Sequence, residues 1–103
     1  MTKALPAESV VVLPAGELDM AEVDAVRAMV GSALARPGIR SLALDVANVT
    51  FIDSSIIGAF LTLHRDAAAR QVGLRLVNVP HQLKRTLNMA GMHAILDYGD
   101  SET

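Results

Sequence analysis

Three apolar runs alternate with longer amphipathic segments in this chain, and that alternation constrains its fold more than any other feature. The runs cover residues 9–15, 41–46 and 73–79, and they are rich in valine and leucine. Such runs are typical of strands buried on both faces of a sheet. Because the intervening segments are long enough for helices, the strands are expected to pair in parallel under helical cover. The sequence therefore predicts an α/β domain with a mixed sheet of about four or five strands and helices packed around it.

Local signals mark the ends of the expected helices. The first helix is expected to begin at Asp19, where Glu22 completes a capping box, and to end at Pro37-Gly38. A second helix is expected over residues 54–70, and a third between Pro80 and Gly91. The apolar face of the first helix is expected to comprise Met20, Val23, Val26, Val30 and Leu34.

The two ends of the chain carry weaker signals. Ala4 and Leu5 are expected to form a short edge strand before Pro6. Residues 94–96 are expected to add a short last strand or to pack as a tail. Gly16-Glu17-Leu18-Asp19, between the first strand and the first helix, is expected to be a turn.

Length and charge limit the classes of protein to which the chain can belong. Its 103 residues suffice for one core, so residues 1–103 are expected to form a single domain. The formal net charge is −2 and there is no basic tract, which argues against nucleic acid as the main partner. Cysteine is absent, and no apolar run approaches the roughly eighteen residues of a membrane span. We therefore expect a cytoplasmic domain that does not insert into membranes.

The stretch Val49–Gly58 holds the strongest candidate site. An apolar strand-like run stops at Asp53, whose carboxylate is suited to cap the helix that follows. Ser54 and Ser55 then fall in the first helical turn, where a phosphate is tolerated because free N–H groups and the helix dipole favour negative charge. The alternative is that these residues merely start a helix. Asp45 and residues 16–19 also follow strands, so they are expected at the same edge of the sheet.

Signatures of enzymes are mostly missing. The chain has no phosphate-binding loop, no dinucleotide fingerprint and no G-x-S-x-G motif, so no catalytic residue and no cofactor is predicted. Its histidines, at positions 64, 81 and 93, fall on different elements. A metal site built from Asp19, Asp45 and Asp53 stays open as an alternative, although no metal is predicted.

The helix expected after Ser54 carries more apolar residues than one buried stripe requires. The surplus comprises Ile56, Ile57, Phe60 and Leu63. It either packs under another helix or forms an exposed docking patch. If the surplus forms a docking patch, we expect Ile56, Ile57 and Phe60 to bind the partner.

Five segments together resemble the STAS domain, and most closely the bacterial anti-sigma factor antagonists. In order and spacing they are Gly16-Glu17-Leu18-Asp19, Leu44-Asp45-Val46, Phe51-Ile52-Asp53-Ser54-Ser55, Leu83-Lys84-Arg85 and Met89-Ala90-Gly91-Met92. The resemblance implies a STAS-like sheet of four or five strands, with Ser54 as a phosphoacceptor supported by Asp53, Ser55, Asp19 and Asp45. It also implies that the dephosphorylated protein, a monomer or weak dimer when free, binds an anti-sigma factor that is also its serine kinase. That binding releases the sigma factor; the kinase supplies the ATP site and a phosphatase resets the switch.

The chain departs from the family pattern at one position in this motif. Ile56 stands where the family has glycine, whereas Gly58 is kept. Isoleucine is compatible with a helix, so we expect the fold to survive and access to Ser54, or the choice of partner, to change. The first strand is also short, which is expected to leave the N-terminal edge of the sheet less covered. The alternative function is a STAS scaffold that is not phosphorylated, such as a cytoplasmic subunit of a lipid transporter or signalling assembly.

Overall fold

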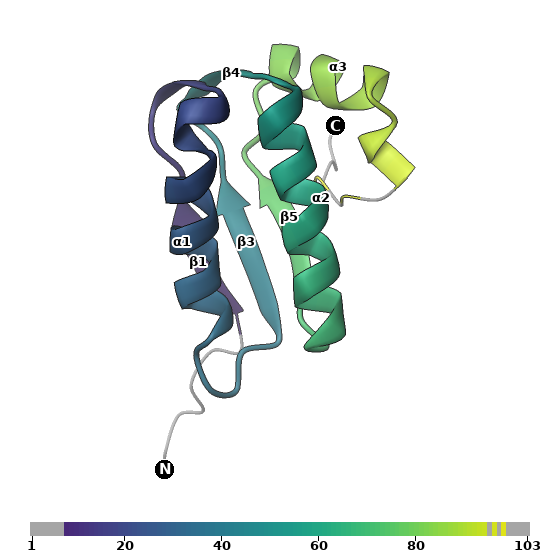
Figure 1. Cartoon of the computed structure of the whole chain (residues 1–103). Coiled ribbons are helices and arrows are strands. Elements are labelled where there is room, and N and C mark those ends of the chain that lie inside the picture. The colour runs from purple at the N-terminus through teal and green to yellow at the C-terminus, as the bar shows by residue number, and fades with distance from the viewer. Residues whose placement is uncertain (1–7, 95, 97, 99–103) are drawn as a thin grey trace.

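The predicted alternation of strands and helices is present in the computed structural model, which describes residues 8–94, 96 and 98 (Figure 1). The α/β class and the five strands are confirmed. In chain order the elements are β1 (Glu8–Val12), β2 (Gly16–Leu18), the 3₁₀ turn η1 (Met20–Glu22), α1 (Val23–Leu34), β3 (Ser41–Asp45), β4 (Val49–Ile52), α2 (Ser54–Ala69), β5 (Gly73–Val77), α3 (His81–Met89) and the 3₁₀ turn η2 (Met92–Ala94).

The five described strands form two sheets, and every described pair is parallel. The larger sheet has the order β1-β3-β5, and the smaller one pairs β2 with β4. The segment 16–18, expected as a turn, is instead the strand β2, because its backbone pairs with that of β4. The edge strand expected at Ala4 and Leu5 lies outside the described residues.

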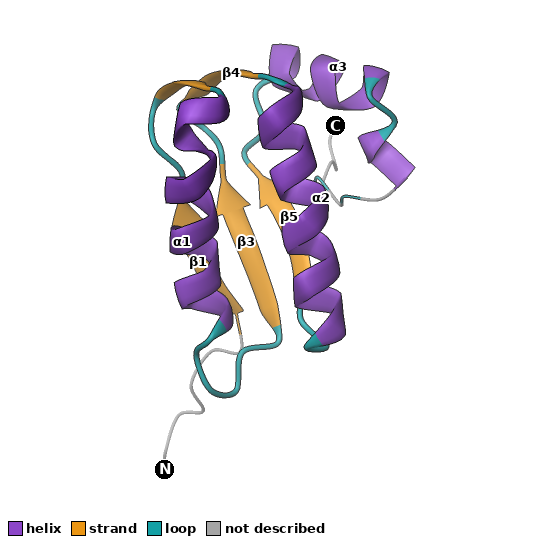
Figure 2. Ribbon diagram, viewed as in Figure 1, coloured by secondary structure: helices purple, strands orange, loops and turns teal. Residues whose placement is uncertain are grey.

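Both long helices lie on the same face of the larger sheet, so the core is a single layer between them and the strands (Figure 2). The strand residues that face the helices alternate with residues of the open face, as the pleat requires. On the helix side, Leu42 and Leu44 of β3 and Leu76 of β5 are wholly buried. The helices contribute Val26, Val30, Ile56, Phe60 and Leu63 to the same core.

The open face of this sheet carries exposed valines and one ion pair. Val10 and Val12 of β1 are 58% and 56% exposed. Beside them, the Arg75 guanidinium donates to the Glu8 carboxylate across β3, and the Ser41 hydroxyl donates to the same oxygen. The Arg75 and Ser41 hydrogen bonds hold the pKa of the Glu8 carboxyl below its usual range.

The C-terminal part of the described chain packs against the core as a tail. Leu83 and Leu87 bury one side of α3, and Gly91 ends that helix with a positive φ of 78°. Leu96 and Tyr98 are buried, which agrees with the tail expected for residues 94–96, although Ile95 and Asp97 lie outside the described residues. Within the described chain, the helices are too short or too polar to cross a bilayer.

Candidate functional site

The site is built where β2 and β4 end side by side. Leu18 and Ile52 are register partners in this parallel pair, and each is followed by an aspartate. Parallel strands end at the same edge of a sheet, so Asp19 and Asp53 are brought to one end of the molecule. Each aspartate then starts a helical segment, η1 in one case and α2 in the other.

Asp53 is the N-cap of α2, as predicted. Its backbone is extended, and its Oδ1 atom accepts a hydrogen bond of 3.0 Å from the backbone N–H of Ile56. Ser54 is therefore the first residue of α2, and it is exposed, whereas Ser55 is half-buried. A group attached to Ser54 would stand in the field of the helix N-terminus, which favours negative charge.

The capping box predicted at Asp19 is also confirmed. Its Oδ1 atom accepts from the backbone N–H of Ala21 at 2.8 Å, and the Glu22 carboxylate accepts from the backbone N–H of Asp19 at 2.9 Å. The box begins η1, which leads into α1. Met20, expected on the buried face of a helix, is 72% exposed because it lies in this 3₁₀ turn before α1.

Asp45 has a local role at the end of β3. Its Oδ1 atom accepts from the backbone N–H of Ala47 at 3.0 Å and so shapes the turn into β4. β3 belongs to the larger sheet, whereas Asp19 and Asp53 follow strands of the smaller one. The described residues contain no group of three His, Asp or Glu side chains placed to hold a metal ion, so the alternative three-aspartate site is not formed.

The predicted docking patch on α2 is wrong for two of its three residues. Ile56 and Phe60 are both 0% exposed, and only Ile57 is half-buried. The reason is that α2 contacts α1 and η1 as well as the strands, so its apolar surplus packs under neighbouring elements. Burial also removes the expected obstruction at Ser54, because the Ile56 side chain lies in the core and not at the surface.

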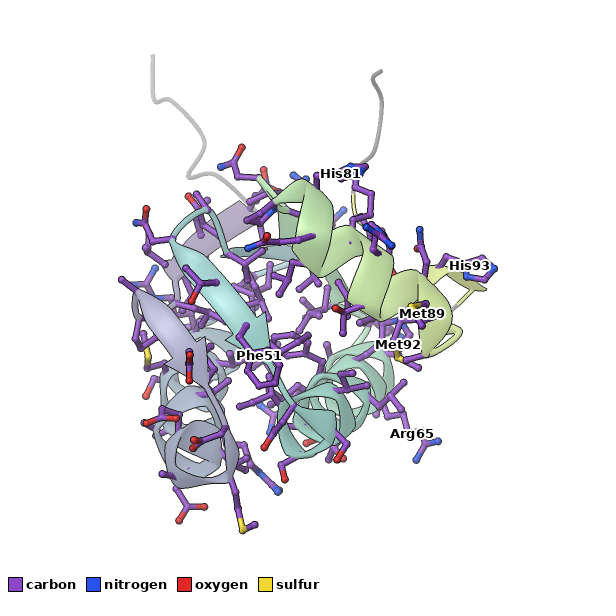
Figure 3. The ribbon with its side chains drawn as sticks, turned by 90° about the horizontal axis from the view of Figure 1, so that it is seen from above. Phe51, Arg65, His81, Met89, Met92 and His93 are labelled. Atoms are coloured by element: carbon purple, nitrogen blue, oxygen red, sulfur yellow. The ribbon has the colours of Figure 1, made fainter. Side chains whose placement is uncertain are left out.

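Two exposed apolar residues at this end, Met20 and Phe51, were not assigned to the surface by sequence reasoning. Phe51 of β4 is 49% exposed, and Met20 follows the capping Asp19 directly. Phe51 is exposed at the end of the molecule seen in Figure 3, whereas Val49 and Ile52 of the same strand are buried. Burial along Val49–Ile52 does not alternate, so a strand pattern in the sequence would not have identified Phe51.

The site is also acidic. The segments 16–24 and 45–58 contain no Lys or Arg. Their six acidic residues are Glu17, Asp19, Glu22, Asp24, Asp45 and Asp53. The segments that contain the two capping aspartates therefore carry negative charge and no positive charge of their own.

Comparison with known proteins gives a family and a set of folds. The STAS domain model matches residues 3–102. An anti-sigma factor antagonist from Mycobacterium paratuberculosis superposes with a TM-score of 0.78 at 20% identity, covering 97% of this chain and 84% of that one. Phosphorylated SpoIIAA, a Bacillus cell fate determinant, superposes with a TM-score of 0.65 at 22% identity, covering 98% and 89%. A sulfate transporter family protein from Wolinella succinogenes superposes with a TM-score of 0.75 at 19% identity, covering 90% and 75%.

The family match spans nearly the whole chain, and the structural neighbours share its fold, including both antagonists and a transporter family protein. The chain belongs to the STAS domain family.

Proposed function

We propose that this protein is an anti-sigma factor antagonist that binds an anti-sigma factor kinase in the cytoplasm and is switched off by phosphorylation of Ser54. The observation that carries the proposal is the position of Ser54, exposed at the start of α2 directly after its capping aspartate. The antagonists among the structural neighbours support the same class of function. In this proposal the partner provides ATP, a phosphatase removes the phosphate, and the free protein is a monomer or weak dimer.

The phosphate would be tolerated in the free protein. It adds about −1.5 to −2 charges at neutral pH, and the N-terminus of α2 returns roughly 0.3–1 kcal/mol of favourable interaction. In water, the repulsion between this phosphate and the Asp53 carboxylate is weak. For a phosphate charge of about −2 at a separation of roughly 6 Å, the repulsion energy is only about 1.5 kcal/mol. The modified serine therefore does not unravel the helix.

Docking would change this balance by excluding water. At the lower dielectric of an interface the same repulsion rises to about 5 kcal/mol, and the phosphate also loses hydration. The difference corresponds to roughly a tenfold to thousandfold loss of affinity. Phosphorylation would thus release the partner with no change in fold.

Kinase treatment followed by mass mapping tests the switch. We expect one phosphate on Ser54, none after Ser54→Ala, and uptake largely unchanged after Ser55→Ala. Ser54→Asp should weaken partner binding at least tenfold, and Ser54→Ala should bind with full affinity whether or not ATP is added. Phosphate on Ser55, or full binding by Ser54→Asp, would show that Ser54 is not the switch.

The exposed apolar residues at the same end of the molecule as Ser54 supply a second test of the same surface. Met20→Ser and Phe51→Ser should each weaken partner binding by about 1–3 kcal/mol, because exposed apolar anchors become buried on docking. Met89→Ser is the matched control, since Met89 is 86% exposed on α3 and lies apart from Phe51 (Figure 3). Isothermal titration calorimetry measures the affinities, and unchanged binding by both Met20→Ser and Phe51→Ser would place the interface elsewhere.

A STAS scaffold that is never phosphorylated is the second candidate. The structural likeness to a sulfate transporter family protein favours it. It predicts binding to a partner that persists equally in Ser54→Ala and Ser54→Asp.

A further inference from the structure

Two loops meet at the end of the molecule where α1 and α2 end (Figure 1). One loop joins α1 to β3, and the other joins α2 to β5. The backbone N–H of Gly73 donates to the Arg40 carbonyl at 2.9 Å, so the loops are tied together where β3 and β5 begin. Between them lies an open pocket of about 400 Å³, lined by Gly38, Ile39, Arg40, Arg70 and Gln71. We call it the Arg40–Arg70 pocket.

The surroundings of this pocket are positively charged. Residues 31–44 and 67–80, which contain both loops, include four arginines and no aspartate or glutamate. One of the four takes part in the ion pair with Glu8 on the open face of the sheet. Arg40 and Arg70 are exposed and line the pocket from different loops. The pocket is therefore suited to an anion that takes both guanidiniums as donors.

Arg70 is held at the pocket by the end of α1. Its Nη1 atom donates a long hydrogen bond of 3.5 Å to the carbonyl of Leu34, the last residue of α1, where carbonyls lack helical partners and the helix dipole favours a cation. A guanidinium has five N–H donors, so this contact leaves others for a ligand. Asp66, one turn earlier on α2, is the nearest acidic residue to Arg70 along the chain, so its removal is expected to strengthen anion binding.

Gln71 adopts a backbone conformation that glutamine rarely takes. Its φ is 62°, in the left-handed region, at the position after the helix cap where glycine is the usual residue. Backbone hydrogen bonds fix this turn, since the N–H of Gln71 donates to the Ala68 carbonyl at 2.9 Å and that of Val72 to the Ala67 carbonyl at 2.8 Å. Strained residues of this kind cluster at functional sites. Glutamine supplies what glycine lacks, a side-chain amide that can donate to a ligand in the pocket.

We propose that the Arg40–Arg70 pocket binds a small phosphate monoester, whose phosphate lies between the two guanidiniums and accepts a further hydrogen bond from Gln71. A phosphate monoester carries about −1.5 to −2 charges at neutral pH, which matches two arginines, whereas a carboxylate carries a single charge. Its oxygens also fit the forked donors of arginine. The pocket volume lies within the range of about 300–1,000 Å³ that is typical of small-molecule sites, so the organic part of the ester has room.

Position and charge separate this ligand from the rest of the chain. Residues 1–7 contain no acidic residue, and the Glu8 carboxylate already accepts from Arg75, so the N-terminal segment supplies no free anion. Ser54 begins α2, which has sixteen residues, so the helix places roughly 24 Å between Ser54 and the pocket. A ligand in the pocket leaves the surface around Ser54 open, and the proposal stands independently of the phosphorylation switch.

The test compares phenyl phosphate with phenyl sulfate, which has nearly the same shape but a single negative charge. Amide NMR of the isotope-labelled protein should show phenyl phosphate shifting residues 38–40 and 70–73. Phenyl sulfate should bind roughly fivefold more weakly, because it lacks the second charge for the second arginine. This preference should fade as the pH falls below about 6, where the phosphate loses its second charge.

Variants identify the groups that bind the phosphate. Arg40→Gln and Arg70→Gln should each weaken phenyl phosphate binding roughly threefold to tenfold, the range between an exposed ion pair and a charge-assisted hydrogen bond. Arg65→Gln, at an exposed arginine of α2 outside the pocket lining, is the matched control and should preserve affinity. Asp66→Asn should strengthen binding. Gln71→Gly should weaken binding without lowering the melting temperature, because glycine relieves the backbone strain, and this combination separates a ligand contact from a structural role.

Several results would overturn the proposal. Equal binding of the two esters, shifts confined to residues 53–56, or unchanged affinity in both Arg40→Gln and Arg70→Gln would exclude the pocket as a phosphate site. Shifts of the pocket residues on dilution of the free protein would identify a second copy as the occupant. A tenfold gain in affinity in the double variant Asp100→Asn, Glu102→Gln would identify the chain's own carboxylates. An acetylated, amidated Gly-phosphoserine-Gly peptide that binds tenfold more tightly than phenyl phosphate would identify a phosphoprotein.

Discussion

At the scale of single residues, the hydroxyl group of Tyr98 lies in an unfavourable, buried environment. The side chain is 9% exposed, and its hydroxyl has no hydrogen-bond partner among the described residues. Burial disfavours the phenolate and raises the pKa of Tyr98 to about 12. The pKa of Tyr98 is higher in the folded protein than in the unfolded chain, where it is near 10. The contribution of Tyr98 to stability is therefore fully present below about pH 10 and is lost as the pH rises through about 12.

We therefore expect unfolding free energy to fall on the order of 2 kcal/mol between about pH 10 and pH 12 through this group. Tyr98→Phe should remove that loss and should be neutral or slightly stabilising at pH 7, because it removes a buried hydroxyl that has no partner within the described chain. Tyr98 is the single tyrosine of the chain, so tyrosinate absorbance reports its ionisation directly. Ionisation near pH 10, or equal alkaline loss in Tyr98→Phe, would contradict this account.

At the scale of elements, the start of α2 depends on one hydrogen bond from Ile56 N–H to Asp53 Oδ1. Asp53→Ala should lower the free energy of unfolding by about 0.5–2 kcal/mol, because a backbone N–H loses its cap. Asp53→Asn keeps an acceptor and should stay close to the wild type. Asp66→Ala, an exposed aspartate in the interior of the same helix, is the control and should change stability by less than about 0.5 kcal/mol. Urea unfolding measures all three, and equal values for Asp53→Ala and Asp66→Ala would exclude the capping role.

At the scale of the whole molecule, both long helices cover the same face of the larger sheet, so the core lies between the helices and that face. The two phenylalanines illustrate this, since Phe60 is 0% exposed in the core and Phe51 is 49% exposed at the acidic end. Phe60→Ala should destabilise the fold by about 3–5 kcal/mol through lost burial and a cavity. Phe51→Ala should cost far less, because half of the side chain is already in water. Thermal unfolding compares the two, and similar losses would contradict the described packing.

Features that depend on neighbours in sequence were predictable. The strand runs, the capping box at Asp19, the N-cap at Asp53 and the helix end at Gly91 are confirmed, because each rests on hydrogen bonds or backbone angles set within a few residues. Asp19 and Asp53 were predictable as caps from the same signals, whereas the parallel pairing of β2 with β4, which brings the two aspartates to one end, was not. The family resemblance is confirmed, and the role of Ser54 stays a prediction.

Features that depend on packing between distant segments were not predictable. The sequence of α2 shows an apolar surplus, but only the positions of α1 and η1 decide that Ile56 and Phe60 are buried while Met20 and Phe51 face solvent. Likewise, only the pairing of β2 with β4 turns residues 16–18 from an expected turn into a strand. Local patterns specify which residues are apolar and where helices begin. Which apolar side chains stay exposed to water depends on how the elements pack against one another. Those packing contacts join residues that are far apart in the chain.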